Sequence, residues 1–279
     1  MQEFFSPLAF DFLWESAQVG ELPYPLRVRS HGATENERVS LRHRTDVELK
    51  ARGIREPRGR PAPPIEDALH LLAFAPLTID ALHIPQFDTP TVGVLAAADE
   101  TKGVLAVQDA DGIWLRDVPP DGLVSAVVGI LPAGPRGSEA SVTLPMDEAL
   151  RTAPIRVPVS LPSAPGEEED TGRRRGKAAP PRRTPLSERV TTDPREAYGR
   201  IAGQPRLRGG QLAANSRSQV GAKQRSRVLA WFDTATGRYL SLSRAGTDGR
   251  EWVTVAPADA ATLRTRLGEM VSSVSDGTR

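Results

Sequence analysis

Two distant stretches of this chain repeat one order of structural signals. Residues 112–131 read GIWLRDVPPDGLVSAVVGIL, and residues 249–270 read GREWVTVAPADAATLRTRLGEM. Each begins with the glycine of an Asp-Gly pair, which is a strong hairpin signal. Each then alternates apolar and polar residues as a strand does, and passes through a proline into an amphipathic helix. The chain therefore contains two similar strand meanders, each followed by a helix.

The repeat restricts the fold because neither half alone is expected to bury enough apolar surface to be stable. Joining the two meanders into one sheet around a pseudo-twofold axis would solve this problem. We therefore predict an α+β fold with a central antiparallel sheet and a quasi-twofold internal repeat. The alternative is that the likeness is accidental, since a hairpin followed by a helix is a common arrangement.

Hydrophobic periodicity, prolines and glycines predict the individual elements. Gly53 is expected to cap the charged second helix at its C-terminus. Helices are expected at residues 7–17, 35–52, 64–75, 121–131, 145–153, 193–204 and 258–274. Strands are expected at residues 77–84, 91–98, 104–109, 113–118, 139–144, 206–215, 226–233, 238–244 and 250–256.

The middle of the chain has a different composition. Residues 154–192 contain almost no large apolar side chain, and an acidic block, GEEED, precedes a basic one, GRRRGK. Such a segment cannot bury enough apolar surface to offset the entropy of ordering it, so we predict a long disordered internal linker. The whole chain, residues 1–279, is then one domain that consists of a first half (1–153), the linker (154–192) and a second half (193–274).

The sequence lacks the usual signatures of catalytic and metal sites. There is no cysteine, which excludes disulfides and thiolate metal ligands. No H-E-x-x-H or G-x-S-x-G pattern occurs, and RGGQ (208–211) lacks the spacing of a phosphate loop, so we interpret it as a backbone turn or bulge. We expect no enzyme, no cofactor and no metal site. The scattered histidines are His31, His43, His70 and His83.

Charge and hydropathy indicate the environment of the chain. The formal net charge is +1, and no uncharged apolar run approaches the length of a membrane span. Acidic residues interrupt the apolar N-terminus, unlike a signal peptide, so we expect a cytoplasmic protein.

Residues 195–227 are rich in Arg and Lys, which raises binding to nucleic acid or an anionic surface as an alternative function. Tyr198 is the only aromatic residue there, and a solvated loop surface is the favoured interpretation.

Five stretches stand out together by their order and spacing: LWESAQVGELPYPLRVRSHG, GVLAVQDADGIWLRDV, RGGQ, RVLAWFDTATGRYL and GREWVTVAPADAATLRTRL. As an ordered set, they resemble the EspG family of actinobacterial type VII (ESX) secretion. The resemblance covers roughly residues 1–150 and 205–273. It implies a central antiparallel sheet, two helical subdomains and a quasi-twofold relation. It also implies a cytosolic, non-enzymatic chaperone that binds the tip of a PPE protein within a PE–PPE pair, keeps it soluble and delivers it for export.

Two local features bear on the partner. In the family, the region between the halves contributes helices to the second subdomain, whereas here it is largely the predicted linker, so a WXG100-like helical hairpin stays open as an alternative substrate. The resemblance also implies contact through the family's loop between its second and third strands. The matching loop consists of Pro85, Gln86, Phe87, Asp88, Thr89 and Pro90. Phe87 is its one large apolar residue, either an anchor for a partner or part of the protein's own core.

Overall fold

The computed structural model describes residues 1–86, 88–152, 193–218 and 220–276. The first repeat consists of β1 (Gln2–Phe5), α1 (Pro7–Ala17), α2 (Glu35–Ala51), α3 (Pro63–Phe74), β2 (Leu77–Ile84), β3 (Val92–Ala98), β4 (Gly103–Gln108), β5 (Ile113–Val118) and α4 (Leu123–Val128). The second repeat consists of β6 (Val142–Pro145), α5 (Met146–Thr152), α6 (Pro194–Ala202), β7 (Arg208–Arg217), β8 (Lys223–Arg225), β9 (Leu229–Thr234), β10 (Gly237–Ala245), β11 (Glu251–Pro257) and α7 (Ala260–Asp276). Its first two elements, β6 and α5, therefore lie within residues 1–153, before the predicted linker.

In the described part of the chain, all strands belong to one antiparallel sheet. Its order is β1-β5-β4-β3-β2-β7-β9-β10-β11-β6, and β8 pairs with β7 outside this row. The two meanders meet at the centre, where β2 pairs with β7 from Leu77 opposite Ser216 to Ile84 opposite Gly209. The predicted central antiparallel sheet built from both meanders is therefore confirmed.

The internal repeat extends further than the sequence indicates. On either side of the β2–β7 seam the strand order is mirrored: β3, β4, β5 and β1 on one side correspond to β9, β10, β11 and β6 on the other. The helices follow the same rule, because α1 and α5 follow the two edge strands, α3 and α6 precede the central strands, and α4 and α7 follow the meanders. Leu123 and Val127 of α4 and Leu263 and Leu267 of α7 pack in one core cluster.

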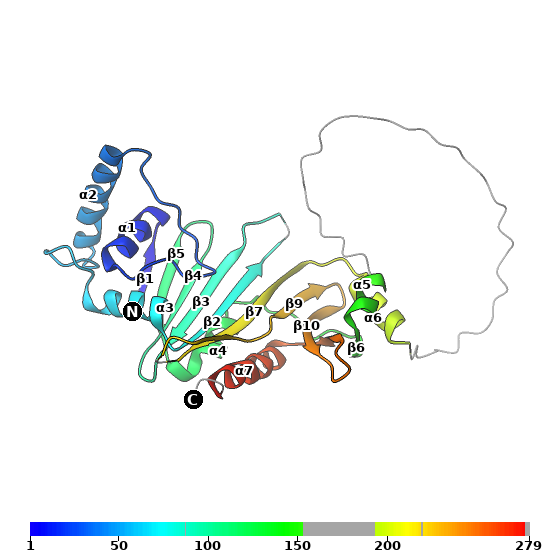
Figure 1. The fold of residues 1–279 in the computed structure, drawn as a ribbon. Helices are drawn as coiled ribbons and strands as arrows, with labels where there is room; N and C mark the ends of the chain where they lie inside the picture. The colour runs from blue at the N-terminus through cyan, green and yellow to red at the C-terminus, as the bar shows by residue number, and fades with distance from the viewer. Residues whose placement is uncertain (87, 153–192, 219, 277–279) are drawn as a thin grey trace, which may run out of the picture.

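The helices cover the two faces of the sheet differently (Figure 1). On one face, α4 and α7 pack against the central strands. On the other face, α1–α3 form a first helical subdomain at one end of the sheet, and α5 and α6 form a second, smaller one at the other end. Successive side chains of β3 point to opposite faces of the sheet. Val94 packs on the α4 side and Leu95 packs on the α1–α3 side.

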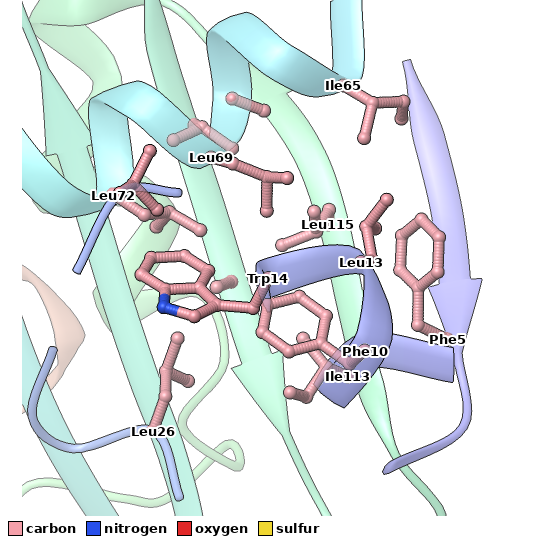
Figure 2. Packing of buried hydrophobic residues seen from close by; sticks show 14 of the residues in the cluster. Phe5, Phe10, Leu13, Trp14, Leu26, Ile65, Leu69, Leu72, Ile113 and Leu115 are labelled. Atoms are coloured by element: carbon pink, nitrogen blue, oxygen red, sulfur yellow. The ribbon is translucent and has the colours of Figure 1, made fainter. Parts of the chain in front are cut away.

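Large aromatic and aliphatic side chains fill the core of the first helical subdomain (Figure 2). Phe10 and Trp14 of α1 stack with ring centroids 5.9 Å apart, and Leu69 of α3 lies fully buried beside them. Phe5 of the edge strand β1 meets Phe10 edge-on. This packing fixes α1 and α3 against the sheet, because buried aromatic residues contribute the largest share of apolar area.

Local signals explain where the helices begin and end. Ser6 caps α1, with its hydroxyl accepting a hydrogen bond from Ala9 N, and Asp193 caps α6 in the same way through Arg195 N. At the end of α2, Gly53 adopts a left-handed φ of 72°, which glycine tolerates without strain. The predicted helices at the start of the chain and at 35–52 and 193–204 are therefore confirmed to within a few residues.

Several sequence expectations differ from the structure. RGGQ is not a turn or bulge but the regular start of β7, and its glycines permit close strand packing. The α-helix predicted at 121–131 is confined to Leu123–Val128 after a 3-10 turn at Pro120–Gly122. The strands β1 and β8 were not expected from the pattern. The disordered linker predicted over 154–192 lies outside the described residues.

Candidate partner interface

The face of the sheet between the two helical subdomains carries the candidate interface. Ile79 and Ala81 of β2 pack on the α7 side, so the alternation of the strand directs Leu82 and Ile84 to the opposite, open face. Both side chains are half-buried. They lie at the end of β2, directly before the predicted partner loop.

Further apolar groups extend this region of the open face. Leu207, which is 55% exposed, stands two residues before Gly209, the pairing partner of Ile84. Tyr24 is 44% exposed, and its hydroxyl oxygen accepts a hydrogen bond of 3.0 Å from Nε2 of Gln211, the residue paired with Leu82. We call Tyr24, Leu82, Ile84 and Leu207 the β2-end surface. Apolar side chains gathered in this way are typical of protein-binding sites.

The predicted partner loop, 85–90, continues directly from the β2-end surface. Gln86 N donates to Thr89 Oγ1 at 3.1 Å, Thr89 N donates to Gln86 O at 3.2 Å, and the Thr89 hydroxyl donates to the same carbonyl at 3.0 Å. These bonds connect the described residues on either side of position 87. Gln86, Asp88 and Pro90 are exposed, while Pro85 and Thr89 are half-buried. Phe87 lies outside the described residues.

A buried histidine supports the end of β2 from the other face. His83 is 7% exposed and stacks on Trp231 of β9, with ring centroids 5.4 Å apart. Burial lowers the pKa of His83, and a hydrogen bond with the Gly209 backbone opposes this by raising it. The nearby charges of Arg208 and Arg238 lower the pKa further. The imidazole is therefore neutral at neutral pH. The sequence placed His83 in a strand but did not predict its burial.

An ionic cluster fixes the strands next to this histidine. Asp233 of β9 accepts hydrogen bonds from Arg208 of β7 at 2.6 Å and from Arg238 of β10 at 2.7 and 2.9 Å. Burial alone would raise the pKa of Asp233, but the hydrogen bonds from Arg238 and Arg208 outweigh it and hold the pKa below its usual value. The two guanidinium groups also donate to the carbonyls of Pro132 and Ala133. The cluster therefore ties the segment after α4 to the sheet.

A second buried carboxylate lies near the start of β2. Asp80 is 3% exposed, and Arg225 of β8 binds both of its oxygens, at 2.6 and 2.9 Å. Asn215 Nδ2 donates to the same carboxylate at 2.7 Å, and the hydrogen bond with Asp80 raises the pKa of Arg225. No motif in the sequence marks this site, although the single acidic residue within the apolar strand LTIDALHI is a usable signal.

The histidines do not come together in the structure. They lie on separate elements, and His70 is exposed on α3. His31 pairs with Asp11 at 3.3 Å. Within the described residues, no three His, Cys, Asp or Glu side chains lie close enough to hold a metal ion.

Among the described helices, none has both the length and the apolar character needed to cross a membrane.

Most of the arginines in the basic stretch 195–227 already have acidic partners. The ion pairs are Arg195–Glu148, Arg200–Glu139, Arg208–Asp233, Arg225–Asp80 and Arg227–Glu251. An arginine that is already paired with a carboxylate neutralises a phosphate less effectively, so fewer counterions are released from a nucleic acid when it binds. The stretch therefore offers much less free positive charge than its composition suggests.

This sheet, with an open face held between two helical subdomains and bordered by exposed apolar side chains, defines a protein-binding scaffold. The EspG family model matches residues 6–269, so the chain belongs to the EspG family. The fold is also similar to that of the chaperone EspG5 of the Mycobacterium tuberculosis type VII secretion system, solved in complex with a PE25–PPE41 dimer. The two chains are 15% identical, the match covers 100% of this chain and 97% of the other, and the TM-score is 0.62. No curated protein sequence matches this chain.

Proposed function

We propose that this chain is a cytoplasmic chaperone of a type VII (ESX) secretion system that binds a PE–PPE pair and keeps it soluble for export. The observation that carries the proposal is the family match over residues 6–269 together with a fold similar along the full chain to a chaperone solved with a PE–PPE dimer. The open sheet face supports the same role, because it offers apolar groups to a helical partner without requiring a cofactor.

The proposed contact is the β2-end surface together with the loop formed by Pro85, Gln86, Phe87, Asp88, Thr89 and Pro90. The turn bonds between Gln86 and Thr89 restrict the described part of this loop before a partner arrives. Less conformational entropy is then lost on docking. In this proposal Phe87 inserts between the helices of the partner as the central apolar anchor.

A WXG100-like helical hairpin is the second candidate substrate. The second helical subdomain is small in the described part of the chain, where α5 spans seven residues and α6 spans nine. A smaller subdomain leaves less surface for the long helical bundle of a PE–PPE pair. The identity of the captured protein distinguishes the two candidates.

A pull-down of the tagged full chain from its native cytosol tests the proposal. We expect PPE-like proteins, or WXG100-like proteins under the second candidate, in the eluate. Recovery of ribosomal or DNA-bound material that nuclease removes would instead support the nucleic-acid alternative. Salt gives an independent check, since phosphate-driven binding weakens by orders of magnitude over a few-fold rise in salt, whereas an interface with an apolar centre weakens far less.

Two charge insertions provide a matched comparison in the same pull-down. Leu207→Glu places a carboxylate on the β2-end surface, whereas Val47→Glu places one on the outer side of α2. The two side chains are similarly exposed, at 55% and 56%. We expect Leu207→Glu to lose the partner and Val47→Glu to keep it. Equal recovery by both variants would contradict the proposed surface.

We also propose that residues 1–279 unfold as a single domain. The support is the pairing of β2 with β7, through which each half supplies the neighbouring strand of the other. Differential scanning calorimetry should then record one transition, with a calorimetric enthalpy close to the van't Hoff enthalpy. Two separate transitions would mean that the halves are independent domains.

A further inference from the structure

A cavity of about 330 Å³ lies on the open face, between the end of α3 and the hairpin that joins β7 to β8. Leu72, Ala73 and Ala75 contribute an apolar wall, and Arg217, Lys223 and Arg225 contribute a basic wall. The cavity lies beside Thr78 and Asp80, near the start of β2, whereas the loop 85–90 follows the other end of that strand. The cavity is therefore separate from the proposed partner loop, although Tyr24 of the β2-end surface also lines it.

The cavity carries an excess of positive charge. Asp80 is the only carboxylate among its lining residues, and Arg225 already neutralises it. Arg217 and Lys223 form no ion pair in the part of the chain that the structure describes. The carbonyl end of α3 contributes roughly half a negative charge. The two free cations exceed this, so the cavity is suited to an anionic ligand.

The backbone that carries the basic wall is held in place before any ligand binds. Arg217 N donates to Pro76 O at 2.8 Å, which joins the end of β7 to the segment after α3. Arg225 is held by both oxygens of Asp80, and Ser226 N donates to Ala214 O at 2.8 Å. Because these bonds already order the backbone, a ligand would need to order only the side chains of Arg217 and Lys223.

We propose that this cavity binds an acidic peptide segment of a partner protein, with carboxylates at Arg217 and Lys223 and an apolar side chain against the α3 wall. The pairing of an apolar wall with a basic wall favours a peptide over a small inorganic anion, which would use only the basic side. This proposal goes beyond the chaperone function and does not rest on it, since it concerns a different ligand class and is tested with a peptide probe.

The test is titration of the full ¹⁵N-labelled chain with the peptide acetyl-Glu-Leu-Glu-amide, followed by NMR. We expect chemical-shift changes at the backbone amides of Asn215, Arg217 and Lys223. The double charge reversal Arg217→Glu with Lys223→Glu should weaken binding by at least about fivefold, because two partly exposed charge pairs are lost and replaced by repulsion. Lys223→Glu alone, at an exposed position, should give a smaller loss in the same direction.

Matched controls separate this site from general electrostatics. Arg244→Glu with Arg264→Glu changes the net charge equally at two exposed positions elsewhere and should leave binding unchanged. The neutral peptide acetyl-Gln-Leu-Gln-amide and the peptide acetyl-Glu-Gly-Glu-amide, which lacks the apolar side chain, should each bind more weakly. The proposal is overturned if inorganic phosphate produces the same shifts, if the neutral peptide binds equally well, or if the double reversal has no effect while thermal melting shows it folded.

Discussion

Arg238 binds both carboxylate oxygens of Asp233 in the interior, with Nε 2.7 Å from Oδ1 and Nη2 2.9 Å from Oδ2. Both residues are nearly inaccessible, at 2% and 4% exposure. The same guanidinium lies 4.6 Å above the ring of Trp231 and donates to Pro132 O at 2.7 Å. One side chain therefore connects β9, β10 and the segment after α4.

Arg238→Met should destabilise the protein strongly, because it leaves the buried Asp233 with only one arginine. Breaking a buried ion pair by removing one partner typically lowers the free energy of unfolding by about 3–5 kcal/mol. Urea denaturation followed by circular dichroism measures this loss. Arg266→Met is the matched control, since Arg266 and Glu269 form an exposed pair on α7, and pairs of that kind contribute about 1 kcal/mol or less. Equal losses in the two variants would contradict the assigned role of Arg238.

Phe87→Ala should weaken partner binding by at least about tenfold, as expected for a central aromatic anchor, while thermal stability changes little. Binding is measured by titration calorimetry with the partner recovered in the pull-down. Phe74→Ala, which removes a half-exposed aromatic residue at the end of α3, should leave binding unchanged. A loss of several kcal/mol in folding stability for Phe87→Ala would instead place that side chain in the core.

The stability of the folded protein should fall on mild acidification because of His83. Its pKa is lowered in the folded state by burial and by Arg208 and Arg238, with Asp233 and the Gly209 backbone acting in the opposite direction. The unfolded chain then binds more protons just below pH 6.5, so the free energy of unfolding decreases as the pH drops from about 6.5, by up to about 1.4 kcal/mol per pH unit for one group.

Urea midpoints measured between pH 7.5 and 5 check this dependence. His83→Phe keeps a ring that can stack on Trp231 but does not titrate, so its stability should vary less over this range. His43→Gln, on the exposed side of α2, should retain the pH dependence of the wild type. An unchanged slope in His83→Phe would show that other groups cause the loss.

Gly210→Ala should prevent normal packing of the central strands. A Cβ at Gly210 would overlap the carbonyl oxygen of Leu82 and lie 2.7 Å from Nε1 of Trp231. Such overlap forces a shift of the β2–β7 seam, and we expect a loss of about 2–4 kcal/mol in unfolding free energy, in the upper range for single substitutions. In contrast, Gly268→Ala on α7 meets no atom within 4 Å and should stabilise the helix by roughly 0.5–1 kcal/mol. Chemical denaturation of both variants makes the comparison direct.

The sequence predicted most elements because their signals are local. Ser6, Asp193 and Gly53 determine helix ends through neighbouring backbone atoms, and the Asp-Gly pairs locate the two hairpins that correspond in the repeat. The strand β1 was missed because QEFF is too short to show an alternation. Its pairing with β5 depends on residues more than a hundred positions away.

The interactions that organise the open face were beyond a sequence pattern for the same reason. Asp80 and Arg225 are separated by 145 positions, and nothing near either residue indicates its partner. The excess of arginine in residues 195–227 raised a basic binding surface as an alternative, but the carboxylates that pair with these arginines come from other parts of the chain. The loop 85–90 was located correctly between β2 and β3, while its role as an interface stays a prediction.

The seam between β2 and β7 also sets an order of events during synthesis on the ribosome. When β2, β3, β4 and β5 have emerged, they can already form a sheet, but β2 remains a bare edge until residues 208–217 have been translated. An unpaired strand edge is a template for association with other chains, and nascent multi-element proteins are most prone to misassembly at this stage. The first half of the chain therefore passes through a period in which the open edge of β2 can pair with other chains before β7 covers it.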